Sequence, residues 1–116
     1  MIYLASVYSL NADEHLMQKR YEFVRGVIAE FLNDGVSVFS PIVHCHEVAK
    51  HHHLPKDWSF WKKVDLDYLS SCTDLFVLRM DGWEDSVGIR AEIDFARENG
   101  IPVTFIPVVG ETKEKK

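Results

Sequence analysis

Four short, largely apolar runs alternate with amphipathic segments along this chain, and that alternation constrains its fold more than any other feature. The runs cover residues 2–5, 36–39, 75–78 and 102–106, and each has the length of a β-strand. Between them, apolar residues recur at the spacing of amphipathic helices. Residues 75–78 are apolar without interruption, which is typical of a central parallel strand covered on both faces. The pattern predicts a small doubly wound α/β layer.

Capping residues mark the first expected helix. Asn11 and Glu14 resemble a capping box, which predicts that the helix begins there, and Gly35 is expected to end it as a C-cap glycine. The apolar residues that should face the core are Leu16, Phe23, Val24, Val27, Ile28, Phe31 and Leu32. With its flanking strands this helix forms a βαβ unit, whose crossover is expected to be right-handed.

Two further helices are expected in the second half of the chain. Asp57 is placed to cap a helix from residue 58 to about 71. The side chains that this helix offers to the core are Trp61, Val64, Leu66 and Leu69. A third helix is expected after Asp85 or Ser86, ending near residue 99. The intervening residues 42–56 are predicted to be a long loop with one helical turn.

Composition limits the class of protein. The 116 residues, of which 47% are hydrophobic, suit one domain, which we place at residues 1–109, followed by a polar tail at 110–116. The net charge of −5 argues against a nucleic-acid partner, because phosphate backbones select a basic surface. No apolar run approaches the roughly 20 residues of a membrane span. Cys45 and Cys72 are interpreted as free thiols, so we expect a cytoplasmic protein without a membrane partner.

The carboxyl ends of the strands are where a doubly wound sheet binds its ligands. In this chain that rule selects residues 5–9, 40–46 and 81–92. If Ser86 caps the third helix, the first backbone N–H groups of that helix are available to an anion, and Gly88 allows a ligand to approach closely. Most helices carry a cap of this type, so the signal is weak.

Glu92 interrupts the apolar stripe of the third helix. The stripe passes through Ile89, Ile93 and Ala96, and Glu92 lies three residues after the first of these and four before the last. A carboxylate on the buried side of a helix is unfavourable unless it is paired or used. Because side chains tilt toward the helix N-terminus, Glu92 is expected to point toward the strand ends. The alternative is that Glu92 lies at the edge of the stripe and reaches water.

Asp65 and Asp67 lie near the end of the second helix, before the central strand. Two carboxylates from separate elements around one pocket suit glycosidic chemistry, with one as nucleophile and the other as acid. Equally consistent with the sequence is a pair of solvated aspartates beside Lys62 and Lys63.

The histidines raise the question of a metal site. His44 and His46 have the spacing of two ligands on one face of a strand, and the run at residues 51–53 could add others. No cysteine or carboxylate falls at a recognised zinc spacing, however, so we expect a solvated loop and no metal. His46 is kept as a candidate ligand contact. The patterns of serine hydrolases, P-loops and dinucleotide-binding folds are missing from the sequence.

Several of these segments together resemble one enzyme superfamily. They are residues 2–6 with Tyr8 and Ser9, Asp65 before the central strand, and Gly82-Trp83-Glu84-Asp85-Ser86-x-Gly88-x-x-x-Glu92 with Ala96 and residues 100–103. These segments are similar to the nucleoside 2-deoxyribosyltransferase superfamily, over nearly the whole chain to about residue 106. Within that superfamily, Phe39-Ser40-Pro41-Ile42 with a following His-x-His resembles a small, uncharacterised bacterial and phage family.

The resemblance implies a flavodoxin-like or Rossmann-like, mostly parallel sheet of four to five strands with helices on both faces. It implies a covalent glycosyl mechanism that needs neither a metal nor an organic cofactor. At the matching positions, Glu92 is the expected nucleophile on the anomeric carbon of a nucleoside, and Asp65 assists departure of the base. The resemblance and the strand-end rule together suggest as substrate-binding residues Ala5, Ser6, Tyr8, His46, Asp81, Gly82, Ser86 and Gly88.

Ser86 departs from the transferases of that superfamily, which carry an aspartate at the matching position, whereas the related deoxynucleoside 5′-monophosphate N-glycosidases have a serine. A serine at a helix N-terminus accommodates a phosphate that an aspartate would repel. This favours a nucleotide substrate and hydrolysis over base exchange. The glycine- and arginine-rich first loop of those hydrolases is replaced by residues 5–9, which leaves the base unspecified.

Two other functions are compatible with the same sequence. One is a non-catalytic nucleotide-binding module with the same pocket, and the other is a structural subunit whose Glu92 is a buried, paired carboxylate. We also expect a homo-oligomer, a dimer or tetramer, because the superfamily that the chain resembles generally associates. The sequence supports this expectation, because it has more apolar side chains in the middle segment than one small sheet can cover. These side chains are Leu54, Trp58, Phe60 and Trp61.

Overall fold

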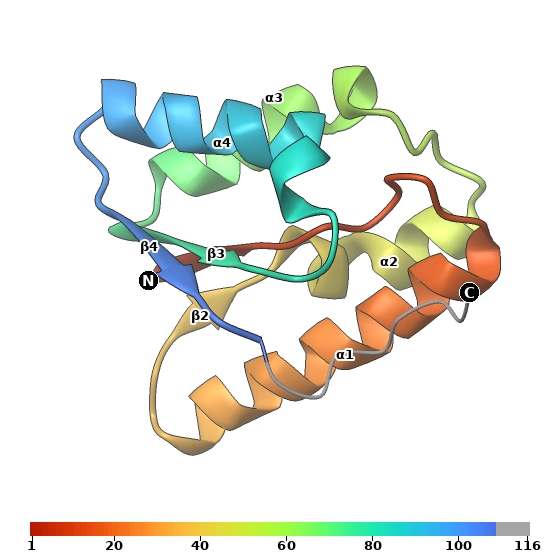
Figure 1. Cartoon of the computed structure of the whole chain (residues 1–116), viewed down its shortest axis with the longest axis horizontal. Helices are drawn as coiled ribbons and strands as arrows, with labels where there is room; N and C mark the ends of the chain where they lie inside the picture. Colours follow the sequence, from red (N-terminus) through yellow and green to blue (C-terminus); the bar gives the residue numbers. More distant parts are fainter. Residues whose placement is uncertain (109–116) are drawn as a thin grey trace.

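The computed structural model of the chain describes residues 1–108, which build a four-stranded sheet (Figure 1). The strands are β1 (Ile2–Ala5), β2 (Val38–Phe39), β3 (Asp74–Leu78) and β4 (Val103–Ile106). They lie in the order β2-β1-β3-β4, and each neighbouring pair is parallel. The predicted small, doubly wound α/β fold is therefore confirmed.

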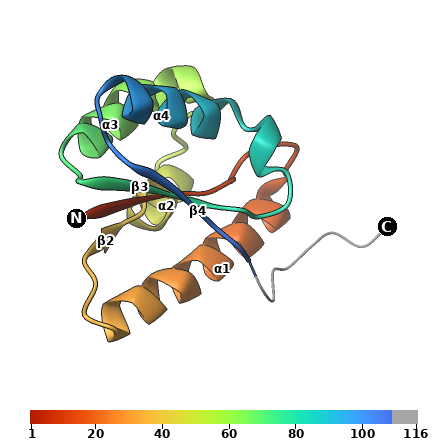
Figure 2. The same ribbon diagram turned by 60° about the vertical axis from the view of Figure 1, so that its left-hand side comes forward.

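Helices connect the strands and cover both faces of the sheet. They are α1 (Glu14–Asn33), α2 (Pro41–His51), α3 (Trp58–Ser70) and α4 (Val87–Glu98), with a short 3-10 turn, η1 (Trp83–Asp85), before α4. α3 and α4 lie side by side on one face, and α1 lies on the other with α2 beside it (Figures 1 and 2). In a parallel sheet of this kind, the loops that follow the strands gather at one edge.

The core lies between the sheet and its helices. Leu75, Val77 and Leu78 of β3 are almost wholly buried, as the uninterrupted apolar run predicts. Tyr3 of β1 pairs in register with Leu75 and is fully buried as well. The central strands are thus covered on both faces, which fixes the positions of their carboxyl ends.

The first helix begins later than its sequence suggests. Asn11 lies outside α1 with a φ of +50°, and Asp13 is the N-cap, its carboxylate accepting a hydrogen bond from Leu16 N at 2.9 Å. The predicted end is confirmed, since Gly35 follows the helix with a φ of +76°. Leu32 does not join the core. It is 58% exposed in the last turn of α1, where the helix diverges from the sheet (Figure 2).

The loop predicted for residues 42–56 is wrong, because α2 occupies most of that segment. Ser40 is its N-cap, with Oγ accepting a hydrogen bond from Val43 N at 3.2 Å, and Pro41 stands at the first helical position. A capping serine followed by proline is a local start signal, because proline's fixed φ suits that position and the helix needs no N–H there. The run of polar histidines obscured this signal in the sequence.

α3 and α4 lie close to their predicted positions. Asp57 occupies the N-cap position of α3, but its carboxylate accepts a hydrogen bond from Ser59 Oγ rather than from a helix N–H. Ser86 caps α4, and its Oγ accepts a hydrogen bond from Ile89 N at 3.2 Å. Val64 was expected in the core but is 39% exposed, because α3 turns Asp65 and Leu69 inward instead.

Within the described part of the chain, every helix is too short or too polar to cross a membrane. Cys45 and Cys72 are free thiols. The polar tail predicted at 110–116, and residue 109 at the end of the predicted domain, lie outside the described residues.

Candidate functional site

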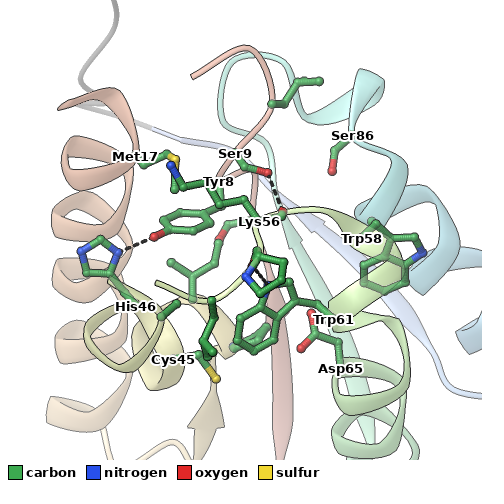
Figure 3. A pocket seen from close by; sticks show the side chains of 18 of the residues that line it. Tyr8, Ser9, Met17, Cys45, His46, Lys56, Trp58, Trp61, Asp65 and Ser86 are labelled. Carbon is green, nitrogen blue, oxygen red and sulfur yellow. Dashed lines mark hydrogen bonds between the residues drawn. The ribbon is translucent and has the colours of Figure 1, made fainter. Parts of the chain in front are cut away.

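A cavity of about 810 Å³ opens at the carboxyl end of the sheet. Tyr8, Cys45 and His46 line one side of it, and Trp58, Trp61, Asp65 and Ser86 line the other (Figure 3). These side chains come from the loop after β1, from α2, from α3 and from the start of α4. Cavities of this size accept small organic ligands.

Glu92 lines this cavity from α4 and is only 5% exposed. Its predicted place on the buried side of the helix is confirmed, and the alternative in which it reaches water is wrong. The hydroxyl of Tyr3, fully buried in β1, donates a hydrogen bond to Glu92 Oε2. Burial raises the pKa of Glu92 to about 8; the hydrogen bond from Tyr3 opposes this shift, and the nearby charge of Asp65 adds to it.

Asp65 lines the same cavity from α3 and is 9% exposed. Its Oδ1 is buried without a hydrogen-bond partner among the described residues. Burial raises the pKa of Asp65 to about 7. Asp67, two residues later, is exposed and pairs with Lys63 Nζ at 2.8 Å. The reading of both aspartates as solvated surface groups therefore holds for Asp67 and is wrong for Asp65.

Burial thus keeps both carboxyl groups of the cavity protonated to unusually high pH. At neutral pH Glu92 retains its proton most of the time, and Asp65 is near the middle of its titration. Burial and the charges of Glu92 and Asp65 hold the pKa of Tyr3 far above its ordinary value, so Tyr3 stays a donor. Two carboxyl groups that exchange protons near pH 7 are suited to acid–base or covalent catalysis.

The loop after β1 holds Tyr8 against α2. Arg20 Nη1 donates hydrogen bonds to the carbonyl oxygens of Tyr8 and Leu10, each at 2.8 Å, which anchors the loop to α1. The Tyr8 hydroxyl lies 2.5 Å from Nδ1 of His46, a histidine that is 4% exposed (Figure 3). Tyr8 and His46 both line the cavity, as predicted.

The histidines do not converge on a metal site. His44 and His46 lie on a helix, where a spacing of two turns them to different faces, so their expected strand-like pairing is wrong. His44 is exposed and packs against the ring of Tyr68 at 5.8 Å between centroids, and His51 pairs with Glu47 at 3.1 Å. Across residues 1–108, no three His, Cys, Asp or Glu side chains are grouped to hold a metal ion.

Ser86 and Gly88 place the N-terminal turn of α4 at the cavity. A Cβ atom on Gly88 would lie 3.2 Å from Cε3 of Trp58, which is closer than an ordinary contact. Gly88 therefore allows the Trp58 ring of α3 to pack closely against α4, and this ring forms part of the cavity wall.

The remaining predicted contacts divide into two groups. Ala5 and Ser6 line the cavity, and the Ser6 hydroxyl is buried without a hydrogen-bond partner in the described structure. The structure does not bring Asp81 and Gly82 to the cavity, which corrects that part of the prediction. Gly82 instead adopts a φ of +88° at the start of η1, beside Leu10, and Asp81 is exposed next to it.

Tyr3, Trp58 and Trp61 belong to the site but were not predicted there. A tyrosine in an otherwise aliphatic buried strand is the signal for Tyr3, since a buried phenol needs a partner. The Trp61 indole donates a hydrogen bond to Pro55 O at 2.7 Å, which holds its ring at the cavity.

Of the residues expected to drive self-association, only Phe60 is clearly exposed, at 44%. Leu54, Trp58 and Trp61 line the cavity. Self-association stays a prediction.

Comparison with known proteins adds one positive finding. Residues 1–107 match the family described as "Domain of unknown function (DUF1937)", so the match includes every strand and helix of the fold. No curated protein matches the chain.

Proposed function

We propose that this chain, which belongs to the DUF1937 family, cleaves the N-glycosidic bond of a nucleoside or nucleoside 5′-monophosphate. In this proposal Glu92 is the nucleophile and Asp65 is the acid. The proposal includes a distant relationship to the nucleoside 2-deoxyribosyltransferase superfamily, which the chain resembles in sequence. One observation carries it: Glu92 and Asp65, from different helices, line one cavity, and burial raises the pKa of each.

The first step forms a glycosyl-enzyme intermediate. The ionised carboxylate of Glu92 attacks the anomeric carbon, so a C–O bond forms as the C–N bond to the base breaks. The electron pair of the broken bond stays on the base nitrogen, and Asp65 donates its proton to the departing base. The Tyr3 hydroxyl, hydrogen-bonded to Glu92 Oε2, supports the ionised form of the nucleophile.

The second step releases the sugar. Asp65, now ionised, accepts a proton from a water molecule, and the resulting hydroxide oxygen bonds to the anomeric carbon as the ester bond to Glu92 breaks. Both carboxyl groups return to their starting forms. If a second base takes the place of water, the same sequence gives base transfer. Hydrolysis is the version that the serine at position 86 favours, because that residue suits a phosphorylated substrate.

The size and lining of the cavity support a nucleotide-sized ligand. Trp58, Trp61 and Tyr8 present aromatic rings on which a planar base can stack. Ser86 lies at the N-terminus of α4, where a phosphate would meet backbone donors. The unpartnered oxygens of Ser6 and Asp65 offer hydrogen bonds that a sugar or base would complete.

A panel of ribo- and deoxynucleosides and their 5′-monophosphates tests the proposal. Free base should appear in equal amount with free sugar from a nucleoside, or with sugar 5-phosphate from a monophosphate, measured by chromatography, together with a rise in melting temperature on binding. Glu92→Gln is the control that should bind without releasing base. Binding without release by the native protein would instead identify the nucleotide-binding module, and neither binding nor release would identify a structural role.

A further inference from the structure

We propose that Gln18 and His46 fix the Tyr8 hydroxyl as a hydrogen-bond acceptor toward the cavity, so that the site selects a ligand group carrying an N–H or O–H donor. The identity of the ligand rests on the proposed function. In a nucleoside or nucleotide, such a donor is an amino group on the base or a hydroxyl on the sugar. The two sources share the same chemistry toward Tyr8.

The orientation of the Gln18 amide is set by two charged neighbours. Its Nε2 donates to the carboxylate of Glu22 at 3.1 Å, and its Oε1 accepts from Lys50 Nζ at 3.5 Å. A carboxylate can only accept and an ammonium can only donate, so the reverse orientation would place like partners together at both ends. Gln18 therefore presents an oxygen, and not an N–H, to His46.

That oxygen decides which nitrogen of His46 carries the proton. His46 Nε2 lies 2.9 Å from Gln18 Oε1, and this contact is a hydrogen bond only if Nε2 carries the proton. Burial lowers the pKa of His46, with contributions in the same direction from Lys50 and Arg25, although Glu47 and Glu22 oppose them. A neutral His46 protonated on Nε2 has a bare lone pair on Nδ1.

The lone pair on His46 Nδ1 in turn directs the Tyr8 hydroxyl. The two atoms lie 2.5 Å apart, so Tyr8 must donate its proton to His46. Burial raises the pKa of Tyr8 to about 12, so this proton is retained at neutral pH. The His46 ring cannot turn freely, because it stacks on Tyr21 with centroids 4.0 Å apart. Toward the cavity the Tyr8 oxygen thus offers only lone pairs.

The tautomer of His46 can be measured without any ligand. In the full chain labelled with ¹⁵N-histidine, NMR should show His46 protonated on Nε2 and bare on Nδ1, with His46→Phe used to identify its signals. Gln18→Glu supplies a carboxylate that stabilises the doubly protonated ring, so Nδ1 should gain a proton in this variant. A proton on His46 Nδ1 in the native protein would overturn the proposal, whatever the ligand is.

Matched ligand pairs measure the resulting selectivity. On the base, deoxycytidine is compared with O4-methyldeoxyuridine and deoxyadenosine with O6-methyldeoxyinosine, since each pair exchanges the amino group for a methoxy group and leaves the neighbouring ring nitrogen without a proton. On the sugar, each hydroxyl is compared with its methyl ether, which only accepts. The native protein should bind the donor-bearing member of the responding pair about tenfold more tightly, and the arm that responds identifies the source of the donor.

Variants separate this role from a purely structural one. His46→Phe keeps a ring on Tyr21 but frees the Tyr8 proton, so the affinity ratio should fall toward one while the fold is retained. Gln18→Glu should reverse the ratio. Trp61→Phe is the matched control, because it changes affinity for both members of a pair and leaves their ratio unchanged. An unchanged ratio in His46→Phe would contradict the proposal.

The two proposals fail in different ways. If none of these compounds binds, the proposed function is wrong, and the NMR measurement alone decides the polarity of Tyr8. If the compounds bind without a preference for the donor-bearing members, the selectivity is wrong, and the base-release assay decides the proposed function separately.

Discussion

The hydroxyl of Tyr3 on β1 donates a buried hydrogen bond to Glu92 on α4, and this bond joins the first strand of the fold to the candidate nucleophile. Both side chains are almost completely removed from water. A donor at this position favours the ionised carboxylate, which burial otherwise disfavours. Tyr3 is therefore a positioning residue for the reactive form of Glu92.

Removal of the Tyr3 hydroxyl should raise the pKa of Glu92. In Tyr3→Phe, the pH at which base release is fastest should move to a higher value, because the bond that stabilises the carboxylate is missing. The variant should also lose about 1–3 kcal/mol of stability at alkaline pH, where Glu92 is charged without its donor. Tyr21→Phe, on the opposite face of the sheet, is the control that should leave the pH profile in place. An identical profile in Tyr3→Phe would contradict this role.

The stability of the protein should depend on pH through Glu92. Its pKa is about 8 when folded and 4.5 in the reference state, so the folded chain holds a proton that the unfolded chain releases between these values. Stability is thus lost as pH rises through this window. Near pH 5, Glu92→Gln should melt within a few degrees of the native protein. At pH 9 its free energy of unfolding should exceed that of the native protein by on the order of a few kcal/mol. Thermal unfolding at both pH values checks this, with exposed Glu98→Gln as control. An equal gain in stability at pH 5 and pH 9 would show that titration of Glu92 does not cause the pH dependence.

Turnover should depend on Glu92 as a nucleophile. Glu92→Gln keeps the shape of the side chain and an acceptor for Tyr3 but cannot form the glycosyl ester. Base release should fall to background while the nucleotide-induced rise in melting temperature is retained. Base release at the native rate would refute covalent catalysis by this residue.

The pH dependence of kcat/KM should be bell-shaped, with a maximum between about pH 7 and 8. The active form needs Glu92 ionised and Asp65 protonated, and the apparent values belong to the coupled pair. Because the pKa of Glu92 lies above that of Asp65, this active form is a minor one that is most populated between the two values. The rate should therefore rise as pH increases to about 7 and fall above about pH 8. In Asp65→Asn the alkaline fall should vanish, and the rate should drop by roughly 10² to 10⁴. Asp67→Asn, exposed on the same helix, should match the native profile. An alkaline fall that persists in Asp65→Asn would assign the acid to another group.

Ser86 tests whether the substrate carries a phosphate. Its Oγ caps α4 through Ile89 N, a role that aspartate fills equally well, so Ser86→Asp should retain the fold and the melting temperature. The new charge at the cavity should lower affinity for a nucleoside 5′-monophosphate by roughly ten- to hundredfold and change affinity for the matching nucleoside little. Calorimetric titration with both ligands measures the difference. Equal affinity for the monophosphate in both proteins would indicate an unphosphorylated substrate and leave the role of Glu92 intact.

Several parts of this protein follow from local sequence patterns. The apolar run of β3, the glycine after α1 and the serine that caps α4 are each read from neighbouring residues, and the structure confirms them. The burial of Glu92 follows in the same way, because the position of a residue within an amphipathic stripe is set by its own helix. A local start signal for α2 is present too, at Ser40 and Pro41, although the histidine-rich composition of the segment after it favours a loop.

The tertiary structure alone decided which groups share the cavity. Asp65 shares the buried side of α3 with Leu69, one turn later, but only the packing of α3 against α4 brings Asp65 to the cavity that Glu92 lines. The pairing of Tyr3 with Glu92 likewise requires β1 and α4 to meet. Helical periodicity is a property of a few neighbouring residues, so the sequence by itself determines which side of an element is buried. A cavity is formed by segments that are far apart in the chain, so its membership depends on how the folded elements pack together.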